Sequence, residues 1–404
     1  MRCTSHANRR FTGRTAGLAL AFTLSIVVSS VRPARATGSA HGTPISLGEL
    51  RPTVDAIGSK CVEPSGGLFG RKPKIVGLVV GIVQDGERAV FGYGTVDHDS
   101  ARVPDGDTAF EIGSITKTFT GVLLADAVRR GEVHLTDAVA DHLPSEVAAK
   151  AHRVPPITLV DLATHTSGLP RLPANLDPKD LDDPYADFDE AALWKYLEKR
   201  GLKRDDDPDS EYSNLGMGLL GHTLVLSAES RPATWEELVA ERILRPLNMN
   251  DTHVGWSADC EARRASPYHK WGKRDRIWTF GVLDAAGSLH STANDMLTWA
   301  DANLGHGSGG IAESIRASHE LHFAMSDRVS SGLAWVVAQP EEIGETVIWH
   351  NGRTGGYSSH LALLPQSNLG IVVLANTSSD LIDETASNLV KDILRIRILP
   401  DFSG

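Results

Sequence analysis

Residues 110–130, FEIGSITKTFTGVLLADAVRR, hold the stretch around which the fold is built. From position 115 onward the apolar residues recur at helical spacing, at Ile115, Phe119, Val122, Leu123, Ala127 and Val128. These positions share one helical face, so the sequence predicts a helix over 115–130 that buries this face. Gly131 follows and is expected to end the helix with a left-handed C-cap.

Ser114 and Lys117 stand three residues apart where this helix begins. That spacing places both side chains on one face, roughly 5–6 Å apart at Cβ. A serine hydroxyl needs an adjacent base to become a nucleophile, and a lysine is such a base when burial or nearby positive charge lowers its pKa. The helix N-terminus also directs backbone N–H groups toward an oxyanion. The plain alternative is a helix-capping serine beside a solvated lysine.

A second pair of chemical groups is Tyr212 and Asn214, within Glu211-Tyr212-Ser213-Asn214. A phenol beside a lysine ammonium can be held as phenolate, which would take a proton from Ser114 and pass it to a leaving group. Asn214 could donate to a substrate carbonyl or orient Lys117. An ordinary turn before a capped helix would also explain these residues, because asparagine readily caps helices.

A third motif, Trp349-His350-Asn351-Gly352-Arg353, ends a predicted strand and runs into a glycine-rich turn. Gly352 would let a ligand approach the backbone closely. An edge strand can pair with an extended substrate and supply an N–H to the oxyanion. His350 could relay a proton beside Tyr212, although a purely structural histidine at a strand end is an equally simple interpretation.

Strand patterns occur at both ends of the chain, and helical patterns fill the middle. The strands are predicted at 75–83, 89–94, 332–338, 345–350, 357–364 and 369–376. Asp85-Gly86 is a hairpin signal between the first two. Helices are predicted at 158–164, 189–200, 214–228, 234–243, 292–303 and 380–397. The simplest assembly is an α+β fold, with one antiparallel sheet made from both ends, flanked by helices, plus an all-α lobe.

These patterns divide the chain into four parts. Residues 1–36 are predicted to be a signal peptide. Residues 37–74 form an N-terminal lead-in, of which 37–50 are expected to be disordered because they are rich in Gly, Ser, Thr and Pro. A sheet lobe is expected from 75–130 together with 331–404, and a mainly helical lobe from 131–330.

The three motifs follow one another in the order Ser-x-x-Lys, Tyr-x-Asn, His-x-Gly, which is far more specific than any of them alone. In this order the chain resembles the penicillin-recognising serine hydrolase superfamily, in particular the branch of class C β-lactamases and low-molecular-weight penicillin-binding proteins. The resemblance extends from about residue 75 to 397. Within that branch, ITLVDLATHTSGLPR at 157–171 and WKYL at 194–197 look most like the AmpH-type carboxypeptidase/endopeptidases.

This resemblance implies a fold and a mechanism. The fold would be a β-lactamase/transpeptidase-like sheet and helical lobe with the site between them. Ser114 would attack a carbonyl and form an acyl-enzyme, while Lys117 and Tyr212 share the proton transfers. The backbone N–H groups of Ser114 and Arg353 would form the oxyanion hole, and Asn214 would bind the substrate amide. Neither a metal nor a cofactor is implied.

One departure from the family pattern affects the expected substrate. Class C β-lactamases commonly carry lysine where this chain has His350, and the loss of a fixed positive charge weakens the hold on a substrate carboxylate. Arg353 could compensate. Several activities therefore stay open: a β-lactamase, a D-alanyl-D-alanine carboxypeptidase or endopeptidase, and an esterase or D-amino-acid peptidase. A penicillin-binding sensor that is acylated but hardly turns over is the non-enzymatic alternative.

The N-terminus predicts export. A basic leader without acidic residues precedes the apolar run 16–28, and Ala34-Arg35-Ala36 offers the small residues that a signal peptidase recognises. Thirteen apolar residues are too few to span about 30 Å of hydrocarbon comfortably, so no membrane span is expected after cleavage. The periplasm and the extracellular medium are both compatible with this prediction.

Cleavage would remove six arginines and change the formal net charge from −11 to −17. A protein this acidic is repelled by the phosphates of nucleic acid, so nucleic acid is not expected as a partner. The family resemblance implies a small-molecule partner, either a β-lactam or a peptidoglycan peptide. Cleavage also removes Cys3. The two remaining cysteines, Cys61 and Cys260, could form a disulfide in an oxidising compartment or stay as free thiols. The sequence leaves the oligomeric state undetermined.

Overall fold

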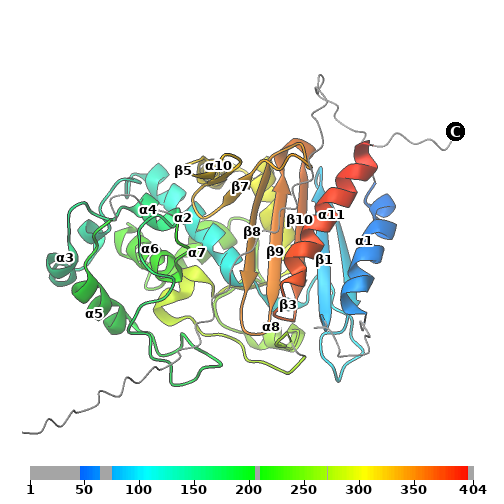
Figure 1. The fold of residues 1–404 in the computed structure, drawn as a ribbon, viewed down its shortest axis with the longest axis horizontal. Coiled ribbons are helices and arrows are strands. Elements are labelled where there is room, and N and C mark those ends of the chain that lie inside the picture. Colours follow the sequence, from blue (N-terminus) through cyan, green and yellow to red (C-terminus); the bar gives the residue numbers. More distant parts are fainter. Residues whose placement is uncertain (1–45, 64–74, 205–209, 271, 399–404) are drawn as a thin grey trace, which may run out of the picture. The chain divides into compact units, whose positions relative to one another are not determined.

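The computed structural model describes residues 46–63, 75–204, 210–270 and 272–398 (Figure 1). The predicted signal peptide, 1–36, lies outside these residues, as do 37–45 and 64–74 of the predicted lead-in. No helix of the described residues is both long and apolar enough to cross a membrane. The division into a sheet lobe and a helical lobe stays a prediction.

Eight strands form one antiparallel sheet in the order β2-β1-β10-β9-β8-β7-β6-β5. Their bounds are β1 Gly77–Gln84, β2 Glu87–Gly94, β5 Phe323–Ser326, β6 Val329–Ser331, β7 Val336–Ala338, β8 Val347–Arg353, β9 Ser358–Leu364 and β10 Leu369–Ala375. The N-terminal hairpin joins the C-terminal strands through β1 and β10, where Val80 lies opposite Val373. The prediction that both ends of the chain build one antiparallel sheet is confirmed.

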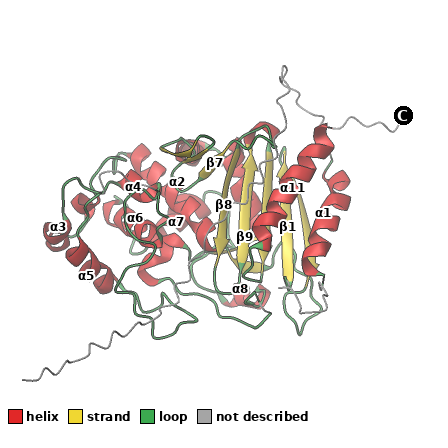
Figure 2. Ribbon diagram, viewed as in Figure 1, coloured by secondary structure: helices red, strands yellow, loops and turns green. Residues whose placement is uncertain are grey.

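Helices cover both faces of this sheet because its strands are apolar on both sides. In β1, Val80 and Ile82 point to the core under α1 (Leu47–Val62) and α11 (Leu381–Ile398). Their neighbours Val79 and Val83 point to the larger core on the opposite face. Successive side chains of a strand face opposite ways, so a continuous apolar run is what a strand covered on both faces requires. Figure 2 shows α1 and α11 lying side by side along the sheet.

The remaining α-helices all lie between β2 and β5 in the chain. They are α2 Thr116–Arg130, α3 Ser145–Ala151, α4 Leu159–Ala163, α5 Glu190–Arg200, α6 Asn214–Ser227, α7 Trp235–Val239, α8 Ala258–Arg263, α9 Ala293–Asp301 and α10 Gly309–Ser318. Helix α2 is buried along most of its length and ends at Gly131 with φ 75°, the left-handed C-cap expected from the sequence.

One prediction is wrong in detail. The segment 37–50 was expected to be disordered throughout, but α1 begins at Leu47 because Ser46 and Glu49 form a capping box. The region 157–330 was expected to be mostly helical, and the sequence did not single out the short strands that lie in it or begin in it. They are β5, β6 and β4 (His290–Thr292), which pairs with β3 (Ala109–Glu111). These strands have three or four residues each, too few for an alternating pattern to stand out.

Candidate active site

The Ser114 hydroxyl is presented by a tight turn between β3 and α2. A short 3₁₀ turn, Gly113–Ile115, leads directly into α2. Gly113 has φ 51°, and a Cβ atom there would lie 2.7 Å from the backbone nitrogen of Arg353. Only glycine tolerates both this conformation and this approach. The turn that carries Ser114 is thereby held directly against the end of β8.

Lys117 is fully buried, and its Nζ atom has three oxygen neighbours. It lies 3.0 Å from Ser114 Oγ, 2.9 Å from Asn214 Oδ1 and 2.6 Å from the carbonyl oxygen of Ala286. Burial, and to a lesser degree the positive charge of Arg171, lowers the pKa of Lys117 well below its ordinary value of 10.5.

All three neighbours accept hydrogen bonds from Lys117 Nζ. The carbonyl oxygens of Asn214 and Ala286 can only accept, so they hold two of its N–H bonds in place. The third hydrogen bond goes to the Ser114 hydroxyl oxygen. Because burial also favours the neutral form of Lys117, its nitrogen lies where a general base for Ser114 would have to be.

Tyr212 lies on the other side of the serine. Its phenol is a hydrogen-bond partner of Ser114, and its ring centroid is 4.8 Å from Lys117 Nζ. Burial raises the pKa of Tyr212 to about 12, against smaller opposing effects from the Ser114 hydrogen bond and the Arg171 charge. The sequence allowed a phenolate here, but the raised pKa favours a neutral phenol, which can donate its proton.

Asn214 is the first residue of α6 and links Lys117 to a residue that the sequence did not single out. Its side-chain nitrogen lies 3.3 Å from the hydroxyl of Tyr185, which orients the amide oxygen toward Lys117. The Tyr185 ring stacks on Phe280, with centroids 5.0 Å apart, and meets Trp278 edge-on. Tyr185 lies in an irregular loop, where no spacing rule predicts which side chain turns inward.

His350 and Gly352 lie on β8, close to the other motifs. His350 is 5% exposed, its Nδ1 atom lies 2.6 Å from the Asn351 carbonyl, and its ring centroid is 6.4 Å from that of Tyr212. Burial, and secondarily the proximity of Lys117, lowers the pKa of His350 to about 3, so the imidazole is neutral. A Cβ atom on Gly352 would lie 2.0 Å from the Ile112 carbonyl oxygen, so this glycine accommodates the serine turn rather than a ligand.

Arg353 contributes to the site only through its backbone. Its guanidinium lies 2.5 Å from an oxygen of Asp380 and 3.7 Å from one of Asp383, at the start of α11. The idea that its side chain replaces the missing lysine of the third motif is therefore wrong. Its backbone nitrogen remains beside the Gly113 turn, where an oxyanion hole would need a donor.

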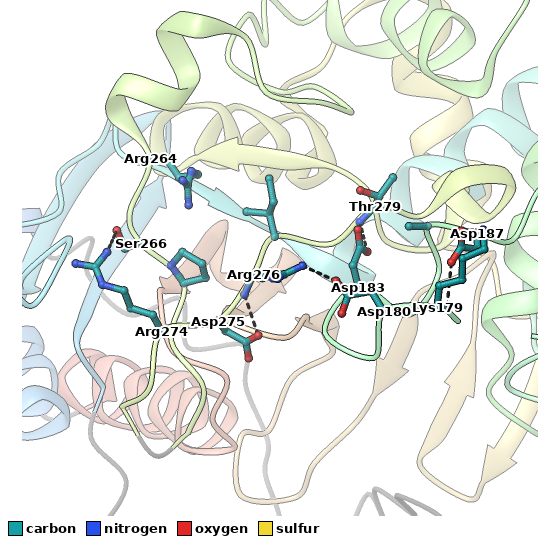
Figure 3. Close-up of a pocket in the computed structure, with 13 residues that line it drawn as sticks. Lys179, Asp180, Asp183, Asp187, Arg264, Ser266, Arg274, Asp275, Arg276 and Thr279 are labelled. Carbon is teal, nitrogen blue, oxygen red and sulfur yellow. Dashed lines mark hydrogen bonds and ion pairs between the residues drawn. The ribbon is translucent and has the colours of Figure 1, made fainter. Parts of the chain in front are cut away.

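A pocket of about 640 Å³ with many charged residues lies between two loops (Figure 3). Its lining residues are Lys179, Asp180, Asp183, Ala186, Asp187, Arg264, Ser266, Pro267, Arg274, Asp275, Arg276, Ile277 and Thr279. None of the three catalytic candidates is among them. Hydrogen bonds and ion pairs join the two loops, including Arg276 to Asp180 and the Thr279 N–H to Asp183. The same two loops carry Tyr185 and Trp278, whose rings meet edge-on.

Two further expectations concern metals and cysteines. Within the described ranges, no group of three or more His, Cys, Asp or Glu side chains is arranged to hold a metal ion. Cys61 and Cys260 are both free thiols. The sulfur of Cys61 lies 3.1 Å from the Thr385 hydroxyl, and Cys260 is buried within α8.

Comparison with known proteins agrees with this geometry. The family model "Beta-lactamase" matches residues 61–393. A β-lactamase of Pseudomonas fluorescens is 27% identical over 360 residues, which cover 81% of this chain and 94% of that protein. The D-alanyl-D-alanine-carboxypeptidase/endopeptidase AmpH of Escherichia coli K12 is 29% identical over 320 residues, covering 74% of this chain and 78% of AmpH.

The crystal structure of a class C β-lactamase from Rhodobacter sphaeroides superposes with a TM-score of 0.68 at 28% identity, covering 79% of this chain and 95% of that one. The α+β fold predicted from the sequence, with its antiparallel sheet and flanking helices, is thereby confirmed. Since the family model spans most of the sequence and the catalytic motifs meet in one place, the chain belongs to the β-lactamase family of serine hydrolases.

Proposed function

We propose that this chain hydrolyses the amide bond of β-lactams or of D-alanyl peptides through an acyl-enzyme on Ser114. The observation that carries the proposal is the environment of Lys117 Nζ, which lies 3.0 Å from Ser114 Oγ while its two other oxygen neighbours can only accept hydrogen bonds. When Lys117 is a neutral amine, the form that its burial favours, this arrangement leaves its lone pair for the serine proton. A helix-capping serine beside a solvated lysine would need no such neighbours.

The proposed reaction begins when Ser114 Oγ bonds to the substrate carbonyl carbon and its proton moves to the Lys117 amine. The carbonyl electron pair collects on oxygen, where the backbone N–H groups of Ser114 and Arg353 stabilise it. The C–N bond then breaks as the Tyr212 phenol gives its proton to the leaving nitrogen, and the Lys117 ammonium restores that proton. Water attacks the acyl-enzyme by the reverse sequence and releases the acid.

The substrate assignment rests on the relatives and on the amide chemistry of the site. One relative is named a β-lactamase, another a D-alanyl-D-alanine-carboxypeptidase/endopeptidase. Both substrate types present a carbonyl to a nucleophile and a nitrogen leaving group that must be protonated. In this chain Tyr212 is a neutral phenol and can supply that proton.

We further propose that the protein is exported to the periplasm or the medium after cleavage behind Ala36. The basic and apolar leader supports this, and both proposed substrates are found outside the cytoplasm. Intact-mass measurement of the protein recovered from a periplasmic extract or culture medium tests it. A chain beginning at residue 37 agrees with the proposal, whereas a full-length chain found only in the cytoplasm contradicts it.

A turnover panel tests the proposed activity: a chromogenic cephalosporin, a peptide ending in D-Ala-D-Ala and a short-chain p-nitrophenyl ester. Wild-type protein should turn over at least one of the two amide substrates, and Ser114→Ala should turn over none. Ser230→Ala, which changes an exposed serine outside the site, is the matched control. A long-lived penicillin adduct without turnover would instead indicate a penicillin-binding sensor.

A further inference from the structure

The third motif of this chain offers no side-chain cation to a substrate. His350 is neutral because it is buried and its pKa is lowered to about 3. Arg353 is turned away and paired with Asp380 and Asp383. Lys117 is fully buried and engaged by Ser114, Asn214 and Ala286. A substrate carboxylate therefore needs a positive charge from another part of the site.

Arg171 is the cation that the fold holds beside the catalytic tyrosine. Its backbone carbonyl accepts hydrogen bonds from the N–H groups of Asn214 and Leu215, at 3.1 and 3.2 Å, which fixes its backbone at the start of α6. Its guanidinium carbon lies 5.2 Å from the Tyr212 ring centroid. The same ring is 4.8 Å from Lys117 Nζ, so Arg171 and the reacting groups border one aromatic side chain.

The Arg171 side chain is also available to a ligand. Residue 171 is exposed, and none of the ion pairs among the described residues includes it, whereas nearby Arg204 pairs with Asp161. A guanidinium that lies over an aromatic ring keeps in-plane N–H donors, which match the two oxygens of a carboxylate. Its charge acts on the site: it helps to lower the pKa of Lys117, and it partly opposes the rise that burial causes in the pKa of Tyr212.

We propose that Arg171 is the anion-binding residue of this active site and that it binds a carboxylate of the substrate. This inference rests on the proposed function, since it assigns specificity to the Ser114 reaction. It also gives the site a fixed cation in place of the lysine that class C enzymes carry at the position of His350. The carboxylate belongs either to the leaving group or to the acyl part of the substrate.

Two pairs of ester substrates distinguish a carboxylate on the leaving group from a carboxylate on the acyl part. For the leaving group, 3-acetoxybenzoate is compared with its neutral methyl ester. For the acyl part, mono-(4-nitrophenyl) succinate is compared with its methyl ester. For each pair, kcat/KM of the acid divided by kcat/KM of the neutral ester gives a preference ratio, which cancels changes that affect both members equally.

Both substrate pairs are measured with the wild type and three variants: Arg171→Gln, Arg171→Lys and the control Arg245→Gln. Arg245 is an exposed arginine directly after the helical segment Ala240–Leu244. Arg171→Gln should lower the preference ratio of one pair by about tenfold, mainly through KM, as expected for loss of a charge-assisted hydrogen bond. Arg171→Lys should retain part of the ratio, and added salt should reduce it in the wild type.

Unchanged ratios for both pairs in Arg171→Gln would overturn the inference. An equal loss of kcat with acids and neutral esters would also overturn it, because that result assigns Arg171 to the tuning of Lys117 and Tyr212. Failure of the proposed function gives a different result: wild type and Ser114→Ala would then hydrolyse the esters at the same rate.

Discussion

Lys117 and Tyr212 carry opposite pKa shifts from one physical cause. Both are enclosed by protein, and burial disfavours whichever form is charged. The pKa of Lys117 therefore falls, which favours its neutral amine, and the pKa of Tyr212 rises to about 12, which favours its neutral phenol. Both groups are hydrogen-bond partners of Ser114, as the proposed mechanism requires of its base and its acid.

Replacing Tyr212 by phenylalanine should test the acid assignment. The Tyr212→Phe variant keeps the ring that packs beside Lys117 and Arg171 but loses the proton donor for the leaving group. Turnover of amide substrates should fall by at least about 10²-fold, the lower range for general acid–base catalysis. Tyr196→Phe, in α5, is the control. An unchanged rate in Tyr212→Phe would remove the phenol from the mechanism.

The pH dependence of kcat/KM should reflect the ionisation of Lys117. Its base form is required, so kcat/KM should fall as pH drops below its lowered pKa and the amine becomes an ammonium. The alkaline side should stay flat up to about pH 10, because Tyr212 keeps its proton until its pKa of about 12. Steady-state measurement from about pH 5 to about pH 10 at constant ionic strength checks this. A profile that rises on acidification would contradict it.

Glu111, three residues before Ser114, should make stability depend on pH. It is buried and accepts a hydrogen bond from the Trp278 N–H at 2.7 Å. Burial raises its pKa from 4.5 to about 7. The neutral acid therefore stabilises the fold fully below pH 4.5, and this contribution is lost as pH rises through about 7.

Glu111→Gln keeps the acceptor for Trp278 and removes the ionisation. Its free energy of unfolding relative to wild type should increase between about pH 5 and about pH 8, by up to the order of 3 kcal/mol. Urea unfolding of both proteins at the two pH values measures this, and the comparison isolates Glu111 from other titrating groups such as Asp284. A difference that does not change with pH would show that Glu111 is ionised throughout.

At the scale of elements, the site depends on β8 lying directly against the turn that carries Ser114. The backbones of Gly352 and Ile112 approach so closely that there is no room for a side chain, and the Ser359 hydroxyl donates to the Ile112 carbonyl at 2.7 Å. This contact brings the Arg353 N–H to the serine turn. The glycine of the third motif is therefore explained by packing between two elements.

Gly352→Ala should separate these elements. The new Cβ would lie 2.0 Å from the Ile112 oxygen and 2.4 Å from Ser359 Oγ, so β8 or the turn must move. We expect a loss of about 1–3 kcal/mol in the free energy of unfolding, as for other overpacked sites, together with a lower kcat/KM. Gly48→Ala in α1, whose Cβ would meet nothing nearer than 3.9 Å, is the control. Equal stability of both variants would contradict the account.

Sequence patterns predicted the elements with strong periodicity and missed those without it. The strands β1, β9 and β10 and the helices α2, α5 and α6 stand where apolar spacing placed them, within a few residues. The strands β3, β4, β5 and β6, of three or four residues each, were missed because so short a run carries no period. Tyr185 was missed because its role depends on a loop folding back onto α6, which local sequence does not specify.

At the scale of the whole molecule, parts of the chain about a hundred residues apart supply the reacting groups. Ser114 and Lys117 come from the start of α2, Tyr212 and Asn214 from the start of α6, and His350 from β8. The motif order in the sequence was enough to predict that these groups meet. Side-chain directions were not predictable. The Arg353 side chain, for example, points to Asp380 and Asp383 at the start of α11, the last helix.

The central claim is that Ser114 is the residue that becomes acylated, and covalent labelling tests it most directly. The purified protein is treated with a fluorescent penicillin, and the label is located by peptide mass mapping. We predict one acyl group on Ser114 in the wild type and in Ser230→Ala, and none in Ser114→Ala. Labelling of Ser114→Ala to the wild-type level would place the nucleophile elsewhere and contradict the mechanism.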